Sequence, residues 1–138
     1  MPGFSCSPRL FFTVDTRRIS DMREYYMQPT EDGAEKIVYQ ILAWPDQGRM
    51  TDLLVTVTVL HPGRVGKEHF HTKGHFHNDP DGPEFVVGYK GTGILQTGDR
   101  TGRAEEVHVG RGTHVLIPEG TGSSCDQSLR RACSVFVH

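Results

Sequence analysis

Short strand-like runs separated by turn residues are the feature of this 138-residue chain that most restricts its fold. Sixteen glycines and eight prolines interrupt runs that are rich in β-branched and aromatic residues. Such runs favour strands, because these side chains pack well on a pleated surface and because Gly and Pro end regular structure. The expected strands are residues 10–14, 36–44, 53–61, 67–71, 85–89, 93–97, 104–109, 114–117 and 133–137. The pattern is typical of an all-β sandwich or barrel.

Turn residues between these runs, and one short helix, complete the expected organisation. The expected turns are residues 61–63, 79–83, 90–91, 98–102 and 110–112. The helix is expected at residues 20–26, where Ser20 can cap the first turn and Asp21 precedes Glu24 by three positions, as in a capping box. A chain of this length forms one hydrophobic core. We therefore expect a single domain over residues 1–138, with an N-terminal arm and helix at 1–35 and a barrel at 36–138.

Composition and charge exclude several classes of function. The formal net charge is -2, so no basic surface indicates a nucleic acid or an anionic membrane as partner. No apolar run approaches the ~20 residues that span a bilayer, and the start of the chain does not resemble a signal peptide. The three cysteines, Cys6, Cys125 and Cys133, are odd in number and lack CxxC spacing, which favours reduced thiols over a Cys125–Cys133 bridge. We expect a soluble, cytoplasmic protein.

A cluster of histidines supplies the strongest chemical signal. His69, His71, His75 and His77 lie close together and are followed by Glu84. Side chains alternate along a strand, so His75 and His77 are expected on the same face. Two imidazoles and one carboxylate form the set that holds iron(II) and related first-row metals. The sequence therefore predicts a metal site made of His75, His77 and Glu84.

Two partial patterns in the correct order resemble the halves of the cupin signature. The matching residues are His75, His77, Glu84 and Gly91 in the first half, and Gly112, Pro118 and Gly120 in the second. In the second half, the position of the usual histidine holds Ser123 and that of the usual asparagine holds Gln127. The resemblance implies a cupin fold, a jelly-roll barrel also described as a double-stranded β-helix, with an N-terminal arm and short helix.

A closer resemblance is to the cupin-type phosphoglucose isomerases known from archaea. The pattern of that family is a Pro-Gly, a Gly-x-Glu, a Thr-Lys-Gly-His-x-His and a glutamate. This chain carries these at residues 62–63, 66–68, 72–77 and 84. Further similarity reaches residues 18–22, 37–39 and 95–97, so the resemblance covers most of the chain from about residue 17.

The resemblance implies a metal-dependent glucose-6-phosphate isomerase, an enzyme of glycolysis and gluconeogenesis. It assigns the metal to His75, His77 and Glu84, with Fe²⁺ as the leading ion and Mn²⁺, Ni²⁺ or Zn²⁺ as alternatives. Glu84 would also move a proton between C1 and C2 of the open-chain sugar. A homodimer is expected by the same resemblance.

The resemblance also assigns the substrate contacts. Thr58, Thr72 and the backbone of Gly74 would hold the phosphate of the sugar phosphate, with Tyr39 near the sugar, and His138 is a further candidate for reaching the substrate. In a regular strand, Thr72 and Gly74 would face away from His75. The chain is therefore expected to leave strand geometry near residues 73–74, where a glycine allows such a break.

Departures from the family pattern leave other functions open. Ser123 occupies the position of the fourth metal ligand, a histidine, and Val86 occupies that of a tyrosine; the family continues past the last strand, whereas this chain ends at His138. Three ligands with open positions still form a workable catalytic site. The alternatives are another metal-dependent cupin enzyme, such as an iron(II) oxygenase or a different sugar isomerase, and a non-catalytic sugar-phosphate-binding cupin with a degraded metal site. His69 and His71 are expected to be structural rather than ligands.

Overall fold

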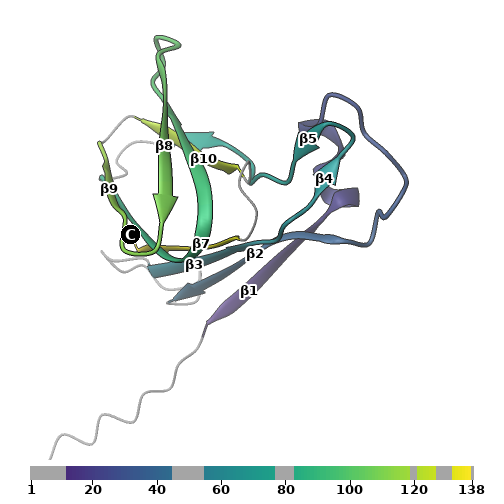
Figure 1. Ribbon diagram of the computed structural model, residues 1–138, viewed down its shortest axis with the longest axis horizontal. Coiled ribbons are helices and arrows are strands. Elements are labelled where there is room, and N and C mark those ends of the chain that lie inside the picture. Colours follow the sequence, from purple (N-terminus) through teal and green to yellow (C-terminus); the bar gives the residue numbers. More distant parts are fainter. Residues whose placement is uncertain (1–11, 45–54, 77–82, 119–120, 127–131, 138) are drawn as a thin grey trace, which may run out of the picture.

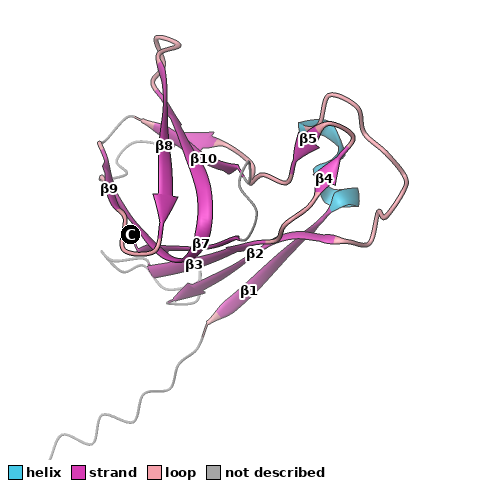
Figure 2. Ribbon diagram, in the orientation of Figure 1, coloured by secondary structure: helices cyan, strands magenta, loops and turns pink. Residues whose placement is uncertain are grey.

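The computed structural model describes residues 12–44, 55–76, 83–118, 121–126 and 132–137, and is almost entirely β-structure (Figure 1, Figure 2). Its elements are β1 (Thr13–Arg18), the 3₁₀ helix η1 (Ile19–Tyr25), β2 (Ile37–Trp44), β3 (Val55–Leu60), β4 (Arg64–Val65), β5 (Glu68–His69), β6 (His75–Phe76), β7 (Glu84–Gly98), β8 (Ala104–Gly110), β9 (His114–Ile117), β10 (Gly122–Asp126) and β11 (Ala132–Val137). The all-β prediction is confirmed. None of the described helical residues forms a segment long and apolar enough to cross a membrane.

Two sheets that share strand β7 form the barrel. In the first sheet, strands β1, β2, β3, β11 and β7 are neighbours in that order, and β9 pairs with the other side of β7. In the second sheet, β10 lies between β6 and the later part of β7, and β8 pairs with that same part. All these pairings are antiparallel. The strands curve around an interior without closing a complete ring of hydrogen bonds within the described residues (Figure 1).

Strand β7 corrects one prediction. The sequence predicts a turn at residues 90–91 between two strands, but β7 runs without interruption from Glu84 to Gly98. Gly91 has a φ of 81°, which side-chain-bearing residues rarely adopt, so this glycine bends the strand instead of ending it. Before the bend β7 pairs with β9 and β11, and after it with β8 and β10. The bend is what carries one strand from the first sheet into the second.

Other strands also differ from the prediction, including the two-residue strands β4 and β6, which were not expected. β1 is Thr13–Arg18 where residues 10–14 were expected, and residues 10 and 11 lie outside the described part of the chain. The expected strand at 67–71 is instead the second arm of the small β4–β5 hairpin, which turns at Gly66 with a φ of 58°. Strand β10 was not predicted, because its small polar residues have low β-propensity. The expected strands at 36–44, 53–61, 104–109, 114–117 and 133–137 are confirmed where they are described.

The short helix begins earlier than its sequence suggests. Helix η1 starts at Ile19, and the Asp21 carboxylate accepts a hydrogen bond of 2.8 Å from the backbone N–H of Arg18. The capping interaction therefore lies upstream of the predicted one at Ser20. The shift brings Ile19 and Met22 into the core, where they are 3% and 0% exposed.

Helix η1, β4 and β5 form a side lobe next to the barrel (Figure 1). The backbone N–H of Met27 donates to the Glu68 carboxylate at 2.8 Å, which ties the segment after the helix to β5. The Phe70 ring packs directly on Gly63, where an added Cβ would lie 2.4 Å from the ring. Gly63 is therefore required for packing as well as for the turn. The core that joins lobe and barrel consists of Ile19, Met22, Tyr26, Val38, Tyr39, Leu60, Val65, Phe70, Val86, Leu95, Val109 and Ile117.

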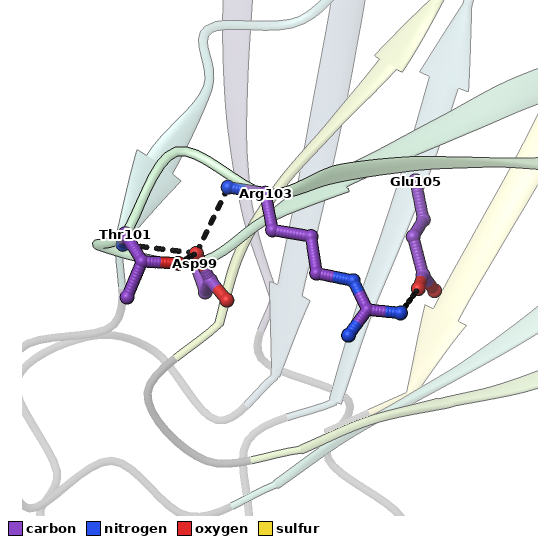
Figure 3. Close-up of polar contacts among 4 residues, drawn as sticks. All are labelled: Asp99, Thr101, Arg103 and Glu105. Atoms are coloured by element: carbon purple, nitrogen blue, oxygen red, sulfur yellow. Dashed lines mark hydrogen bonds and ion pairs between the residues drawn. The ribbon is translucent and has the colours of Figure 1, made fainter.

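The β7–β8 turn is organised by one aspartate (Figure 3). The Asp99 carboxylate accepts hydrogen bonds from the hydroxyl of Thr101 at 2.6 Å, from its backbone N–H at 2.9 Å, and from the backbone N–H of Arg103 at 3.0 Å. These contacts lower the pKa of Asp99, with the Thr101 hydroxyl as the largest cause. Gly102, with a φ of 87°, completes the turn predicted at residues 98–102.

The lowered pKa of Asp99 predicts a pH-dependent turn. A carboxyl whose pKa is depressed in the folded state stabilises the fold above its ordinary pKa of about 3.9, and this contribution is lost as the pH falls through the folded-state pKa. Asp99→Asn is expected to lower the urea midpoint at pH 6 but to have less effect at pH 3. Urea unfolding of both proteins at the two pH values measures the difference. A constant difference between them would contradict the assignment.

Candidate active site

Glu84 and Ser123 meet inside the barrel. Glu84 opens strand β7 and is 4% exposed, and Ser123 lies in β10 and is 8% exposed. The Ser123 hydroxyl donates a hydrogen bond to Glu84 Oε2 at 3.3 Å. Buried carboxylates occur where cations or hydrogen-bond donors meet them, and the Ser123 hydroxyl is one such donor. The contact joins Glu84, the carboxylate of the first half of the cupin signature, to Ser123, which replaces the usual histidine of the second half.

The strand register brings the start of the histidine motif to the same place. Ser123 lies directly opposite His75 of β6 on one side and opposite Thr97 of β7 on the other. Three segments that are far apart in sequence therefore converge at Ser123. The side chain of His75 and the whole of His77 and His138 lie outside the description. Among the side chains that are described, no three His, Cys, Asp or Glu residues form a group that could hold a metal.

Tyr39 and Thr58 lie on neighbouring strands in the interior. They are 3% and 6% exposed. Thr58 pairs with Ile41, which makes Tyr39 its diagonal neighbour across the β2–β3 ladder. Diagonal neighbours have Cα atoms roughly 7–8 Å apart, within reach of an aromatic side chain.

The segment 72–74 leaves strand geometry, as predicted. Residues 72–74 form no strand between the bridge at His71 and the start of β6 at His75. The backbone N–H of Lys73 donates to the Tyr39 hydroxyl. The Lys73 ammonium lies 4.6 Å from the centre of the Tyr25 ring. The His71 ring lies against Tyr26, with 4.7 Å between ring centres. The loop is thus attached both to β2 and to the end of helix η1.

Burial raises the pKa of Tyr39, and burial outweighs the opposing effect of the Lys73 hydrogen bond. A group with a raised folded-state pKa stabilises the fold below its ordinary pKa, and that contribution is lost as the pH rises through the folded-state pKa. The neutral phenol is therefore the form that holds residue 73 at neutral pH.

Tyr39→Phe is expected to loosen this loop. The change removes the acceptor of the Lys73 N–H and should cost about 0.5–1.5 kcal/mol of unfolding free energy. It should also increase hydrogen–deuterium exchange at the Lys73 amide. Tyr25→Phe, which keeps an aromatic ring under the Lys73 ammonium, is the matched control. Unchanged exchange in Tyr39→Phe would contradict the role of the hydroxyl.

Three other described histidines, His61, His69 and His71, have structural contacts. His69 Nε2 is 3.0 Å from an Arg64 guanidinium nitrogen, and His61 Nε2 is 3.4 Å from Gln40 Oε1. His71 packs on Tyr26, as described above. These contacts support the structural interpretation of His69 and His71. Val86, where the family pattern has a tyrosine, is 1% exposed and belongs to the core.

Two contacts of the site were missed by the sequence analysis. The Ser123–Glu84 hydrogen bond could have been predicted, because both positions belong to the cupin signature. Ser123 was interpreted only as the loss of a metal-binding histidine. The Lys73–Tyr39 hydrogen bond could not have been predicted, because it depends on how a loop folds over a distant strand.

Comparisons with known proteins agree with the motif. A family model described as glucose-6-phosphate isomerase matches residues 16–119. The glucose-6-phosphate isomerase of Thermococcus kodakarensis is 41% identical over 108 residues, which cover 74% of this chain and 56% of that protein. The glucose-6-phosphate isomerase of Pyrococcus abyssi is 39% identical over 109 residues, covering 74% and 57%. The chain thus spans little more than half the length of these relatives.

Solved structures show the fold. A variant of oxalate decarboxylase from Bacillus subtilis matches with a TM-score of 0.55 at 19% identity, over 72% of this chain and 24% of that one. Iron(II)-containing HppE matches with a TM-score of 0.52 at 14% identity, over 80% of this chain and 53% of that one. These similarities, with the two sheets sharing β7, identify the fold as a cupin.

Proposed function

Because this chain belongs to the glucose-6-phosphate isomerase family, we propose that it interconverts glucose 6-phosphate and fructose 6-phosphate in the cytoplasm, with a divalent metal bound by His75, His77 and Glu84. The observation that supports this most is the position of Glu84, a carboxylate buried in the barrel at the glutamate of the family motif. The register that sets His75 opposite Ser123, the hydrogen-bond partner of Glu84, supports the same ligand set.

Glu84 moves the proton in the proposed reaction. Its carboxylate takes the proton from C2 of the open-chain aldose and returns it to C1, while a second proton passes from the C2 hydroxyl to the carbonyl oxygen at C1, which gives the ketose. The reverse reaction uses the opposite order. Burial in the interior keeps bulk water from exchanging that proton. A divalent cation at the site would polarise the neighbouring carbonyl and hydroxyl oxygens of the sugar. Fe²⁺ is the proposed ion, since two imidazoles and a carboxylate suit it, and Mn²⁺, Ni²⁺ and Zn²⁺ are alternatives.

The loop at residues 72–74 and Thr58 are proposed to bind the phosphate of the sugar. Backbone N–H groups and threonine hydroxyls donate to phosphate oxygens without an arginine. Departure of the loop from strand geometry is the support for this role, because it frees residues 72–74 from a sheet ladder. Tyr39 would fix the loop beside Thr58 through its contact with Lys73. His138 remains a proposed further contact.

A coupled assay tests the proposal. Protein stripped with EDTA and reloaded with Fe²⁺ or Mn²⁺ is expected to produce fructose 6-phosphate, whereas the stripped protein is expected to be inactive. Zinc, nickel and magnesium reloading in parallel identifies the effective ion. Metal-dependent stabilisation without isomerase activity would point to another metal-dependent cupin enzyme. Stabilisation by sugar phosphate alone, with no effect of any metal on thermal unfolding, would point to the non-catalytic binding protein.

We also propose a homodimer that forms through the outer face of the first sheet. The register puts Val14, Trp44, Phe85 and Leu116 on that face, and Tyr89 follows Phe85 on the same side of β7. All five are exposed, from 42% to 67%. Six strands about 4.8 Å apart, each with about three outward side chains, give a face of roughly 600 Å². That is the low end of what stable dimers bury per partner, about 600–1,000 Å².

Leu116→Lys tests the dimer. A lysine ammonium buried in an apolar interface loses its hydration without gaining a partner, so the variant is expected to be monomeric at concentrations where the wild type is dimeric. Sedimentation velocity distinguishes the two. Met27→Lys, a change at an 85% exposed apolar residue of the side lobe, is the control and should leave the dimer intact. A monomeric wild type would refute the proposal.

A further inference from the structure

We propose that Ser123 is a positioning residue that holds the Glu84 carboxylate in its metal-binding and proton-transferring orientation. The inference deepens the proposed isomerase and rests on it. At this position the family pattern has a fourth metal ligand. Here the geometry assigns a different role: a hydroxyl that contacts a ligand in place of a side chain that binds the metal itself.

The contact acts on one oxygen of the carboxylate. The Ser123 hydroxyl has one proton to donate, and it meets Oε2 of Glu84. A donor fixed on one oxygen restricts the rotation of the whole carboxylate group. Carboxylates that bind metals commonly accept such a hydrogen bond, which orients the ligand. The 3.3 Å separation is longer than the usual ~2.7–2.8 Å of a hydroxyl–oxygen hydrogen bond, and catalytic hydrogen bonds often tighten once the ligand is bound.

The backbone fixes Ser123 on both sides. Its strand, β10, lies between β6 and β7, with Ser123 opposite His75 in one ladder and opposite Thr97 in the other. A residue in a central strand cannot shift without breaking both ladders. The hydroxyl is therefore held at a fixed distance from the start of β7, where Glu84 lies. Both residues are buried, so water competes little for the bond.

The role has a consequence for coordination. A neutral serine hydroxyl is a poor ligand for a first-row divalent cation. The site is left with three protein ligands and more open positions than a four-ligand site has. The hydrogen bond from Ser123 then compensates for the missing ligand by stiffening one of the three that remain.

Three variants test the inference by direct metal binding, independently of activity. Calorimetric titration of the metal-free protein with Mn²⁺ is expected to show affinity weakened about 10–100-fold in Ser123→Ala. Ser123→Thr keeps the hydroxyl and should restore the affinity to within a few-fold of the wild type. Thr97→Val removes a hydroxyl from the residue opposite Ser123 and should leave the affinity unchanged. Thermal unfolding of each metal-free variant shows whether it folds.

The steady-state constants add a second readout. Ser123→Ala is expected to lower kcat at saturating Mn²⁺ with little change in KM for fructose 6-phosphate, because the phosphate contacts are untouched. Wild-type Mn²⁺ affinity in Ser123→Ala would overturn the inference, and so would a Ser123→Thr variant as weak as the alanine variant. A wild type that binds Mn²⁺ through Ser123-dependent affinity but does not isomerise the sugar would refute the isomerase alone. A wild type that binds no Mn²⁺ would overturn the positioning role.

Discussion

Replacing Glu84 with glutamine is expected to lower the isomerase kcat by about 10²–10⁴-fold, the usual contribution of a general base. The amide has nearly the same shape and can still accept the Ser123 hydrogen bond through its oxygen, so the fold should persist. It cannot take up a proton at neutral pH, and it carries no charge to attract a cation. The measurement is kcat with saturating Mn²⁺, together with the Mn²⁺ dissociation constant.

The control for Glu84→Gln is Glu106→Gln. Glu106 is an exposed glutamate in β8. It accepts a hydrogen bond from the Gln96 amide and does not line the barrel interior. Its substitution should leave both constants unchanged. If Glu84→Gln retained wild-type kcat once saturated with metal, the proton would have to be moved by another residue, and Glu84 would be at most a ligand.

Gly88→Ala is expected to cause the largest loss of stability of any alanine substitution considered. An added Cβ would lie 2.0 Å from the carbonyl oxygen of Gly110 and 2.9 Å from Val109 Cγ1. The backbone cannot simply shift, because Gly88 N–H donates to Thr113 O at 2.9 Å and its carbonyl accepts from Gly112 N–H at 2.8 Å. Overpacking of this kind costs about 3 kcal/mol or more. The thermal midpoint should fall by roughly 10 °C.

Gly98→Ala is the matched control, because it is in the same strand. Its added Cβ would lie 3.6 Å from Arg103 O, an ordinary contact distance. Its thermal midpoint should stay within about 2 °C of the wild type, as for most substitutions at tolerant surface positions. Equal midpoints for the two variants would show that the backbone can adapt at the close approach of Gly88 to the Gly110 carbonyl.

Local sequence patterns predicted the strands that carry β-branched runs between clear turn residues. Strands β2, β3, β8 and β9 are of this kind, and β3 also shows a clear alternation of apolar and polar side chains. The patterns were wrong where a tertiary pairing overrides the local signal. Gly91 looked like a turn residue, yet hydrogen bonds from four neighbouring strands hold β7 together through it. The polar strand β10 exists only because β6 and β7 pair with it on both sides.

The sequence likewise predicted some parts of the candidate site and not others. The family motif identified Glu84 and the departure at Ser123, because both follow from spacing along the chain. Their contact does not, since it depends on the register of β10 against β6 and on where β7 begins. The predicted break near residues 73–74 came from a physical requirement. Thr72 and Gly74 would face away from His75 in a regular strand, so the strand must end if all three are to contact one ligand. The anchoring of that loop by Tyr39 and Tyr25 depends on packing and left no trace in the local sequence.

The position of β11 has a consequence for how the protein folds during synthesis. This strand, at Ala132–Val137, is inserted between β3 and β7 in the middle of the first sheet. The sheet therefore stays divided until residue 137 has left the ribosome, with the exposed strand edges of β3 and β7 waiting for a partner. Such non-local pairings close late and slowly, on the order of milliseconds to seconds. Until then, the two open edges are the surfaces at which a nascent chain is most exposed to aggregation or to a chaperone.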